Sequence, residues 1–197
     1  MNKKLVALFN LMLVLTAING LGYSLWSKTL TITGTVTMAE LNVVIESYKA
    51  ITPVGYDEVA PISSVLSPDG RTLEVSCDNV FPCWLVWVGL NTHNIGTVPA
   101  NVKNVVISFE DPNNIQQHFE IEEYFYGPYD DGNFKVVWGD VKADDLPFGG
   151  SQSLPIPIDP CQHAIAWMKI HFKDTSDPAA MNKSIKILIT IVDDLAI

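Results

Sequence analysis

The stretch SIKILITIVDD, residues 184–194, decides the fold class. Apolar side chains recur at every second position, so that four isoleucines share one face of an extended chain, while Lys186 and Thr190 fall on the other. A period of two residues is typical of a β-strand that packs one face against a core. We therefore predict a core strand from Ser184 to Asp193, with these residues pointing inward: Ile185, Ile187, Ile189 and Ile191.

The chain on both sides of this strand follows the same period. The β-branched and aromatic runs are WLVWVGLN (84–91), NVKNVVISFED (101–111), FKVVWGD (134–140) and AIAWMKIHFKD (164–174). The first is apolar on both faces, as expected of a central strand in a two-layer core. Turn signals such as SPDG, DPNN and PFGGS separate the runs. The pattern predicts an all-β domain, an antiparallel, jelly-roll-like β-sandwich, with NNIQQHFEIEEYF (113–125) as a candidate short helix.

Length and charge narrow the classes of partner. The chain has 197 residues and a formal net charge of −10, which suits one domain with a soluble, acidic surface. Such a surface would repel the phosphates of nucleic acids, so we expect no nucleic-acid partner.

The N-terminus has the plan of a signal peptide. Lys3 and Lys4 precede an uncharged apolar segment, and Gly22 and Ser24 form a small-x-small pair that places cleavage between Ser24 and Leu25. Removing residues 1–24 would leave ten basic and 22 acidic residues, a net charge of −12. The alternative is an uncleaved membrane anchor, since no charge occurs from Leu5 to Ser27. The segment predicts a secreted, extracellular protein that meets a membrane only before cleavage.

Export permits disulfides, and the chain has three cysteines. Cys77 and Cys83 flank a turn in SCDNVFPCW, and their bridge is our first choice of pairing. A bridge between Cys83 and Cys161 is the second choice, and three reduced thiols are the remaining alternative.

Motifs for catalysis or metal binding are missing from the sequence. The histidines, His93, His118, His163 and His171, form no His-Glu-x-x-His pair, and GGSQS (149–153) lacks the context of a nucleophile elbow. We expect structural or exposed histidines, no enzyme, no metal ligands and no cofactor. The acidic turns YDDGN and KADDLP leave bound calcium open. Asn182 begins a glycosylation sequon, Asn-Lys-Ser, ahead of the last strand.

Residues 25–37 form a separate strand directly behind the predicted cleavage site. Apolar side chains share one parity, and Thr29, Thr31, Thr33, Thr35 and Thr37 share the other. Such a strand is either an edge strand of its own domain or a donor strand that fills a groove in another copy. A donated strand makes a head-to-tail contact that does not close, and therefore a filament. The residues expected to carry it are Leu25, Trp26, Leu30, Ile32, Gly34 and Val36.

Three segments resemble a known family. LWSKTLTITGTVTMAELNV, VGLNTHNIGTVPANVKNVVISFED and WMKIHFKDTSDPAAMNKSIKILITIVDD resemble, in this order, parts of TasA/camelysin-type secreted proteins, and the chain looks most like archaeal bundling pilins. The resemblance covers about half the chain and implies a jelly-roll sandwich that builds extracellular fibres by donor-strand complementation. Some members are labelled metalloproteases, but no zinc-binding spacing occurs here.

These observations predict residues 1–24 as signal peptide, 25–37 as donor strand and 38–197 as β-sandwich domain. The expected function is a structural subunit of pilus-like or biofilm fibres at the cell surface, a homopolymer whose lateral bundling is left open. The alternative is a monomeric surface or S-layer-associated binding domain that keeps its first strand to itself.

Overall fold

The computed structural model describes residue 6 and residues 9–16, 39–56, 58–130, 132–133, 138–174 and 178–196. The chain divides into two compact units, Met1–Met38 and Ala39–Ile197. In the first unit, residues 9–16 are helical. Among the described residues, no helix has the length and apolar character needed to cross a membrane.

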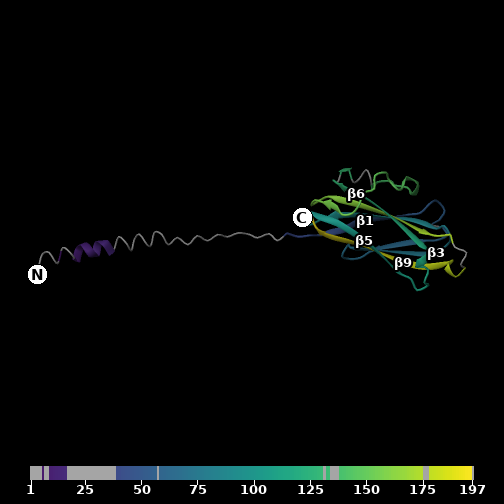
Figure 1. Cartoon of the computed structure of the whole chain (residues 1–197), viewed down its shortest axis with the longest axis horizontal. Helices are drawn as coiled ribbons and strands as arrows, with labels where there is room; N and C mark the ends of the chain where they lie inside the picture. The colour runs from purple at the N-terminus through teal and green to yellow at the C-terminus, as the bar shows by residue number, and fades with distance from the viewer. Residues whose placement is uncertain are drawn as a thin grey trace. The chain divides into compact units, whose positions relative to one another are not determined.

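The second unit is an antiparallel β-sandwich, which confirms the predicted fold class (Figure 1). The four-stranded sheet has the order β1 (Val43–Ile51), β4 (Leu85–Asn94), β8 (His163–Phe172) and β6 (Phe119–Tyr129). The five-stranded sheet has the order β2 (Ile62–Leu66), β3 (Thr72–Val80), β9 (Lys183–Leu195), β5 (Ala100–Glu110) and β7 (Ile156–Ile158). Short 3-10 turns occur at Gln116–His118, Ala143–Asp145 and Pro178–Ala180.

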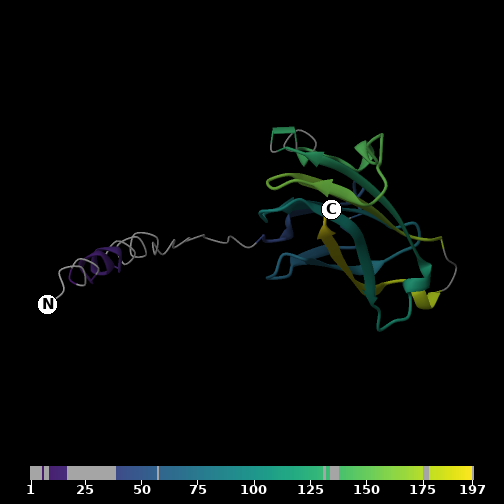
Figure 2. The ribbon, with the colours of Figure 1, turned by 60° about the vertical axis from the view of Figure 1, so that its left-hand side comes forward.

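The connections wind the chain between the two layers. Every connection except that from β2 to β3 passes from one sheet to the other, as in a jelly roll. Figure 2 shows the two layers from a second direction, with β5 in teal running along the domain.

The core lies between the sheets and follows the alternation in the sequence. Ile185, Ile187, Ile189 and Ile191 of β9 are all buried in it, as predicted. In β4, Val86, Val88 and Leu90 also point into this core. The opposite face of β4 is buried too, so β4 is the central strand that its apolar pattern predicts.

A second apolar cluster covers the outer face of the four-stranded sheet. Its buried members are Trp87, Tyr126, Trp138, Ile165 and Trp167. Residues 141–148 pack against them, and Figure 1 shows this green segment beyond β6, outside the sandwich. The cluster explains why β4 and β8 are apolar on both faces.

Two predicted elements differ from the structure. In 113–125 only Gln116–His118 is helical, and the chain then continues as β6. Phe119, Ile121 and Phe125 sit at alternate positions and pack in or against the core, which is the pattern of a strand. The run 134–140 is predicted as a strand. In its described part Trp138 is helical and residues 139–140 form a bend, and residues 134–137 lie outside the described residues.

Both ends of the β-sandwich unit contact the same loop. The backbone N–H of Thr97 donates to the carbonyl of Glu40 at 2.9 Å, and the N–H of Ala196 donates to the carbonyl of Pro99 at 3.2 Å. The chain therefore enters and leaves the domain beside the loop between β4 and β5.

Candidate functional site

The predicted donor strand cannot be compared with the structure. All of its residues, 25–37, and the predicted cleavage site between Ser24 and Leu25 lie outside the described residues. The domain that would accept such a strand is described from Ala39 onward.

β5 has an edge that is paired for only part of its length. One side of β5 pairs with β9 from Ala100 to Glu110. The other side pairs with the three-residue strand β7, and only over Ala100–Val102. Beyond Val102, no strand among the described residues pairs with this edge. Unpaired N–H and C=O groups on such an edge are a template for another extended chain.

The side chains beside this unpaired edge are only partly shielded. Along β5, Val105 is buried, but Ile107 and Phe109 are half-buried although they pack against the core cluster. On β6, the half-buried Ile121 also packs against that cluster. Val106, on the outer face of β5, is 46% exposed. The sandwich is thus incompletely covered along the half of β5 that β7 does not reach, and we call Lys103–Glu110 the open edge.

One charged residue of β6 lies on the inward-facing side of this edge strand, although its side chain is exposed at the rim of the sandwich. Glu123 pairs with Met168 of β8, and directly paired residues in antiparallel strands share a face. Met168 is fully buried in the core cluster, so Glu123 lies on the inner face. Partial burial raises the pKa of the Glu123 carboxyl above its ordinary value. An inward-pointing charge at a sheet edge is a device that discourages unwanted pairing.

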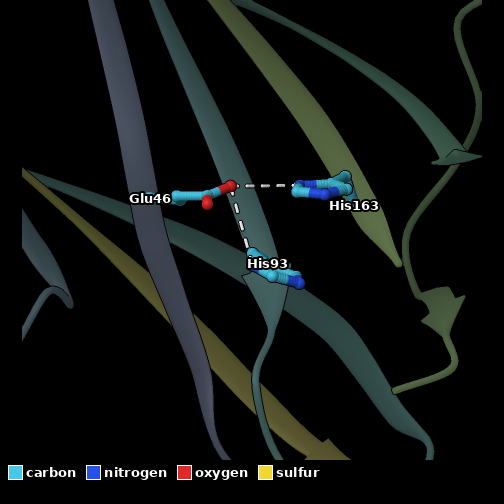
Figure 3. Close-up of side chains that lie close together, drawn as sticks. All are labelled: Glu46, His93 and His163. Atoms are coloured by element: carbon cyan, nitrogen blue, oxygen red, sulfur yellow. Dashed lines mark ion pairs between the residues drawn. The ribbon is translucent and has the colours of Figure 1, made fainter. Parts of the chain in front are cut away.

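The structure also brings together three residues that sequence reasoning did not connect. Glu46 of β1, His93 of β4 and His163 of β8 meet on the outer face of the four-stranded sheet (Figure 3). Glu46 Oε2 lies 3.6 Å from His93 Nδ1 and 3.4 Å from His163 Nδ1. The two imidazole rings stack with their centroids 4.2 Å apart.

A β-bulge places Glu46 in this cluster. Ile45 pairs with Thr92 and Ser47 pairs with Asn91, so Glu46 is an extra residue between two regular pairs. Such a bulge re-aims a side chain without disturbing the rest of the strand. The amide Nδ2 of Asn91 donates to Glu46 Oε2 at 3.1 Å and to Ser47 Oγ at 3.2 Å.

Spacing along the sequence gave no sign of this cluster. His163 and His171 share a parity, but they lie at opposite ends of β8, and His171 pairs with Leu85. The partner of His163 is His93, which lies directly across from it on β4. That pairing depends on strand order and register, which short motifs do not encode. The sequence predicts structural or exposed histidines, and the buried His163, whose Nδ1 lies 3.1 Å from Asn91 Oδ1, agrees with this; the cluster itself was not predicted.

The predicted disulfides are absent, because all three cysteines are free. Cys77 lies on the inner face of β3 within the core, where burial raises its pKa to about 12, whereas Cys83 is exposed in the following turn. The second choice also fails. Cys83 precedes the start of β4, and the N–H of Cys161 bonds to the carbonyl of Asn94 at the end of that strand, so the two thiols belong to opposite ends of β4.

The remaining predicted sites lie in turns. Asn182 is exposed directly before β9, with φ of 55°, where its side chain is accessible to glycosylation. In the turn KADDLP, Asp145 accepts a hydrogen bond from the N–H of Lys142 at 3.0 Å. In YDDGN, Asp130 accepts one from the Gln162 amide at 3.1 Å, and Asp131 lies outside the described residues.

A cavity of about 630 Å³ lies on the outer face of the four-stranded sheet. Tyr126, Tyr129 and Phe148 give it an aromatic lining, and Asp140 and Asp145 add carboxylates. Its size lies in the range of small-molecule pockets.

Comparison with known proteins adds no family: no protein-family model matches the sequence, and a search of curated proteins finds no match. The function must therefore be argued from the open edge, the cavity and the Glu46–His93–His163 cluster.

Proposed function

We propose that the chain is a structural subunit of a secreted, extracellular fibre. In this proposal residues 25–37 of one copy, the arm, add as a strand to the open edge of the next copy. The observation that carries the proposal is the half-covered β5 edge in a domain that directly follows a strand-like segment. The resemblance to TasA-type fibre proteins agrees with it.

The dimensions of the arm and the open edge are compatible. At about 3.3 Å per residue, the arm can span about 43 Å, whereas the eight residues of the open edge span about 26 Å. The apolar stripe of the arm, which includes Leu30, Ile32 and Val36, would cover the half-buried Ile107 and Phe109. Backbone pairing would set the direction and register of the added strand.

The positions of the domain's ends favour a chain of copies. Residues leading to β1 enter beside Thr97, next to the covered end of β5. The open edge extends from there toward Glu110. An arm that leaves one copy at the covered end and pairs with the open half of another gives a contact between two different surfaces, which propagates instead of closing.

Substitution within the arm tests the proposal. Ile32→Asp places a charge in the apolar stripe, where it would be buried without a partner, so we expect electron microscopy to show discrete particles in place of fibres. Thr33→Asp carries the same charge on the polar stripe and is expected to form fibres. Normal fibres from Ile32→Asp, or none from the unaltered mature chain, would contradict the proposal.

A binding experiment locates the acceptor. A peptide of residues 25–37 is added to the Ile32→Asp protein, whose open edge is intact. We expect the peptide to raise the melting temperature by mass action and to slow amide hydrogen exchange in residues 103–110. If residues 103–110 are already protected from exchange without peptide, and the peptide changes neither measurement, the arm pairs within its own domain as an ordinary edge strand.

Export underlies the same mechanism. Removal of residues 1–24 would free Leu25 as the first residue of the arm. Intact-mass measurement of secreted protein is expected to give a chain that begins at Leu25, and a retained N-terminal segment would contradict the freed-arm mechanism.

The cavity beside Tyr126 and Phe148 favours a second candidate, a monomeric surface domain that binds a small ligand. Electron microscopy separates the two, because a monomeric binding domain remains as discrete particles at every protein concentration. We propose no catalytic role for either form.

A further inference from the structure

We propose that Glu46, His93 and His163 bind one Zn²⁺ ion on the outer face of the four-stranded sheet. This inference stands apart from the fibre proposal, because all three residues belong to the β-sandwich unit and none belongs to the arm. One potential ligand atom from each residue lies within 4.8 Å of the other two.

The separations between the ligand atoms match those around a metal ion. With bonds of about 2.1 Å, the ligand atoms of a tetrahedral zinc site lie about 3.4 Å apart. Glu46 Oε2 lies 3.4 Å from His163 Nδ1 and 3.6 Å from His93 Nδ1. Both separations exceed the usual length of an N–H···O hydrogen bond. The three ligand atoms therefore lie close enough together for one ion to bind all of them (Figure 3).

The chemistry of the ligands selects the kind of cation. Imidazole nitrogens suit zinc and neighbouring transition metals, whereas Ca²⁺ and Mg²⁺ prefer oxygen ligands. Two imidazoles and one carboxylate supply three protein ligands. The side chain of Glu46 is 49% exposed, which leaves solvent access for a water ligand in the fourth position.

Neighbouring residues hold the ligands in place before any metal binds. Asn91 is fully buried, and its Nδ2 donates to Glu46 Oε2, which orients the carboxylate. Its Oδ1 lies 3.1 Å from His163 Nδ1, and a zinc ion bound at this nitrogen would take the place of that contact. The imidazole of His163 is 3% exposed and that of His93 is 18% exposed, so both rings have little freedom to turn. Contacts of this kind orient metal ligands and contribute to affinity.

The expected effect of zinc is to join three adjacent strands. The ligands come from β1, β4 and β8, and β1 is an edge strand of its sheet. An ion that binds only the folded state stabilises it, and once the ion concentration exceeds Kd the stabilisation grows with the logarithm of the ratio of concentration to Kd. Zinc should therefore raise the melting temperature and protect β1 from local opening.

The test measures zinc binding by calorimetry and by thermal unfolding of the full-length chain. Cys83 and Cys161 are exposed thiols that can themselves bind zinc, so every protein carries Cys83→Ser and Cys161→Ser. We expect one Zn²⁺ per chain and a rise in melting temperature that Ca²⁺ and Mg²⁺ do not produce.

Variants identify the ligands. Glu46→Gln and His93→Gln alter partly exposed side chains, so both proteins are expected to fold. Loss of an outer-shell contact weakens metal binding by roughly 10- to 100-fold, and we expect loss of a direct ligand to cost at least as much. His171→Gln is the matched control, because His171 lies on the same strand and face as His163 but at the other end.

Two results would overturn the proposal. One is a folded parent protein whose melting temperature does not respond to Zn²⁺. The other is a response that Glu46→Gln and His93→Gln retain in full, which would place the ion elsewhere and leave the cluster as a carboxylate that pairs with two histidines.

Discussion

At the scale of single residues, Ile189 lies at the centre of the five-stranded sheet. It pairs with Leu73 of β3 on one side and with Ile107 of β5 on the other. Its side chain is fully buried in the core, and both flanking strands pack around it.

Truncation of Ile189 should therefore be costly. We expect Ile189→Ala to lower the free energy of unfolding by about 2–5 kcal/mol, since a rigid core leaves a cavity where the side chain was. Val192→Ala, at a position that is 36% exposed on the same strand, is the control and should cost much less. Urea unfolding measures both, and equal losses would argue against Ile189 as a core residue.

Glu123 predicts a dependence of stability on pH. Partial desolvation in the folded state raises the pKa of its carboxyl, so the folded chain holds this proton to a higher pH than the unfolded chain does. Stability from this group is accordingly lost as the pH rises from the unfolded-state pKa, about 4.3, through the higher folded-state value.

The variant Glu123→Gln removes that loss. It should be more stable than the parent at pH 7, and the difference should shrink at a pH below about 4, where the carboxyl is protonated in both states. Glu120→Gln makes the same change on the opposite face of the strand, where Glu120 pairs with His171, and should shift stability little at either pH. A difference for Glu123→Gln that grows on acidification would contradict the inward position of Glu123.

At the scale of elements, the bulge in β1 decides which side chains face the core. Val43, Ile45 and Tyr48 pack in or against the core, while Ser47 pairs with Asn91 on the outer face. Without Glu46, these residues and Lys49 would alternate inward and outward without interruption. Glu46 is thus the one residue that a regular strand does not require.

Deletion of Glu46 is expected to leave the fold intact. The melting temperature without zinc should stay near that of the parent, but the rise on adding Zn²⁺ should be lost. Deletion of Val44 is the matched control, because it keeps the bulge. A shift of one residue moves each side chain to the other face, so this deletion turns the buried Val43 outward and should be destabilising. Comparable destabilisation by both deletions would show that the bulge is needed for folding.

The elements also show how far sequence patterns reach. β9 could be predicted because its side chains alternate between apolar and polar, as in a strand buried on one face. β4 could be predicted because it is apolar at nearly every position, as in a strand buried on both faces. In β6, Glu122 and Glu123 interrupt the alternation, so the sequence suggests a short helix there. Only the pairing of β6 with β8 places Glu123 on the inward-facing side of a strand. The meeting of His93 with His163 depends on the pairing of strands that lie far apart in the chain. Such pairing is a property of topology, and no local motif carries it.

At the scale of the whole molecule, charge opposes assembly. The chain without residues 1–24 would carry a net charge of −12, and copies brought together in a fibre repel one another. Salt screens this repulsion, with a Debye length that falls from about 30 Å at 0.01 M to about 8 Å at 0.15 M.

Fibre formation by the mature chain should therefore be faster and more complete at about 0.15 M salt than at about 0.01 M. Light scattering with electron microscopy measures this. A variant with Thr33→Lys, which adds a positive charge on the polar stripe of the arm and so lowers the net negative charge of the chain, should need less salt. Assembly that slows as salt is added would indicate that attraction between charges, and not burial of the apolar stripe, drives association.

The place of β1 determines how the domain would carry a mechanical load. Any tension transmitted through the chain before Ala39 reaches the sandwich at the start of β1, after the hydrogen bonds between Glu40 and Thr97. β1 pairs with β4 through eight aligned positions, from Val43 with Asn94 to Ile51 with Trp87. A pull along the strand axis strains all eight in shear at once, whereas a sideways pull would peel them apart in turn. A zinc ion at Glu46 would add a coordinate tie close to the loaded end, and the force needed to extract β1 would then rise and fall with the supply of metal.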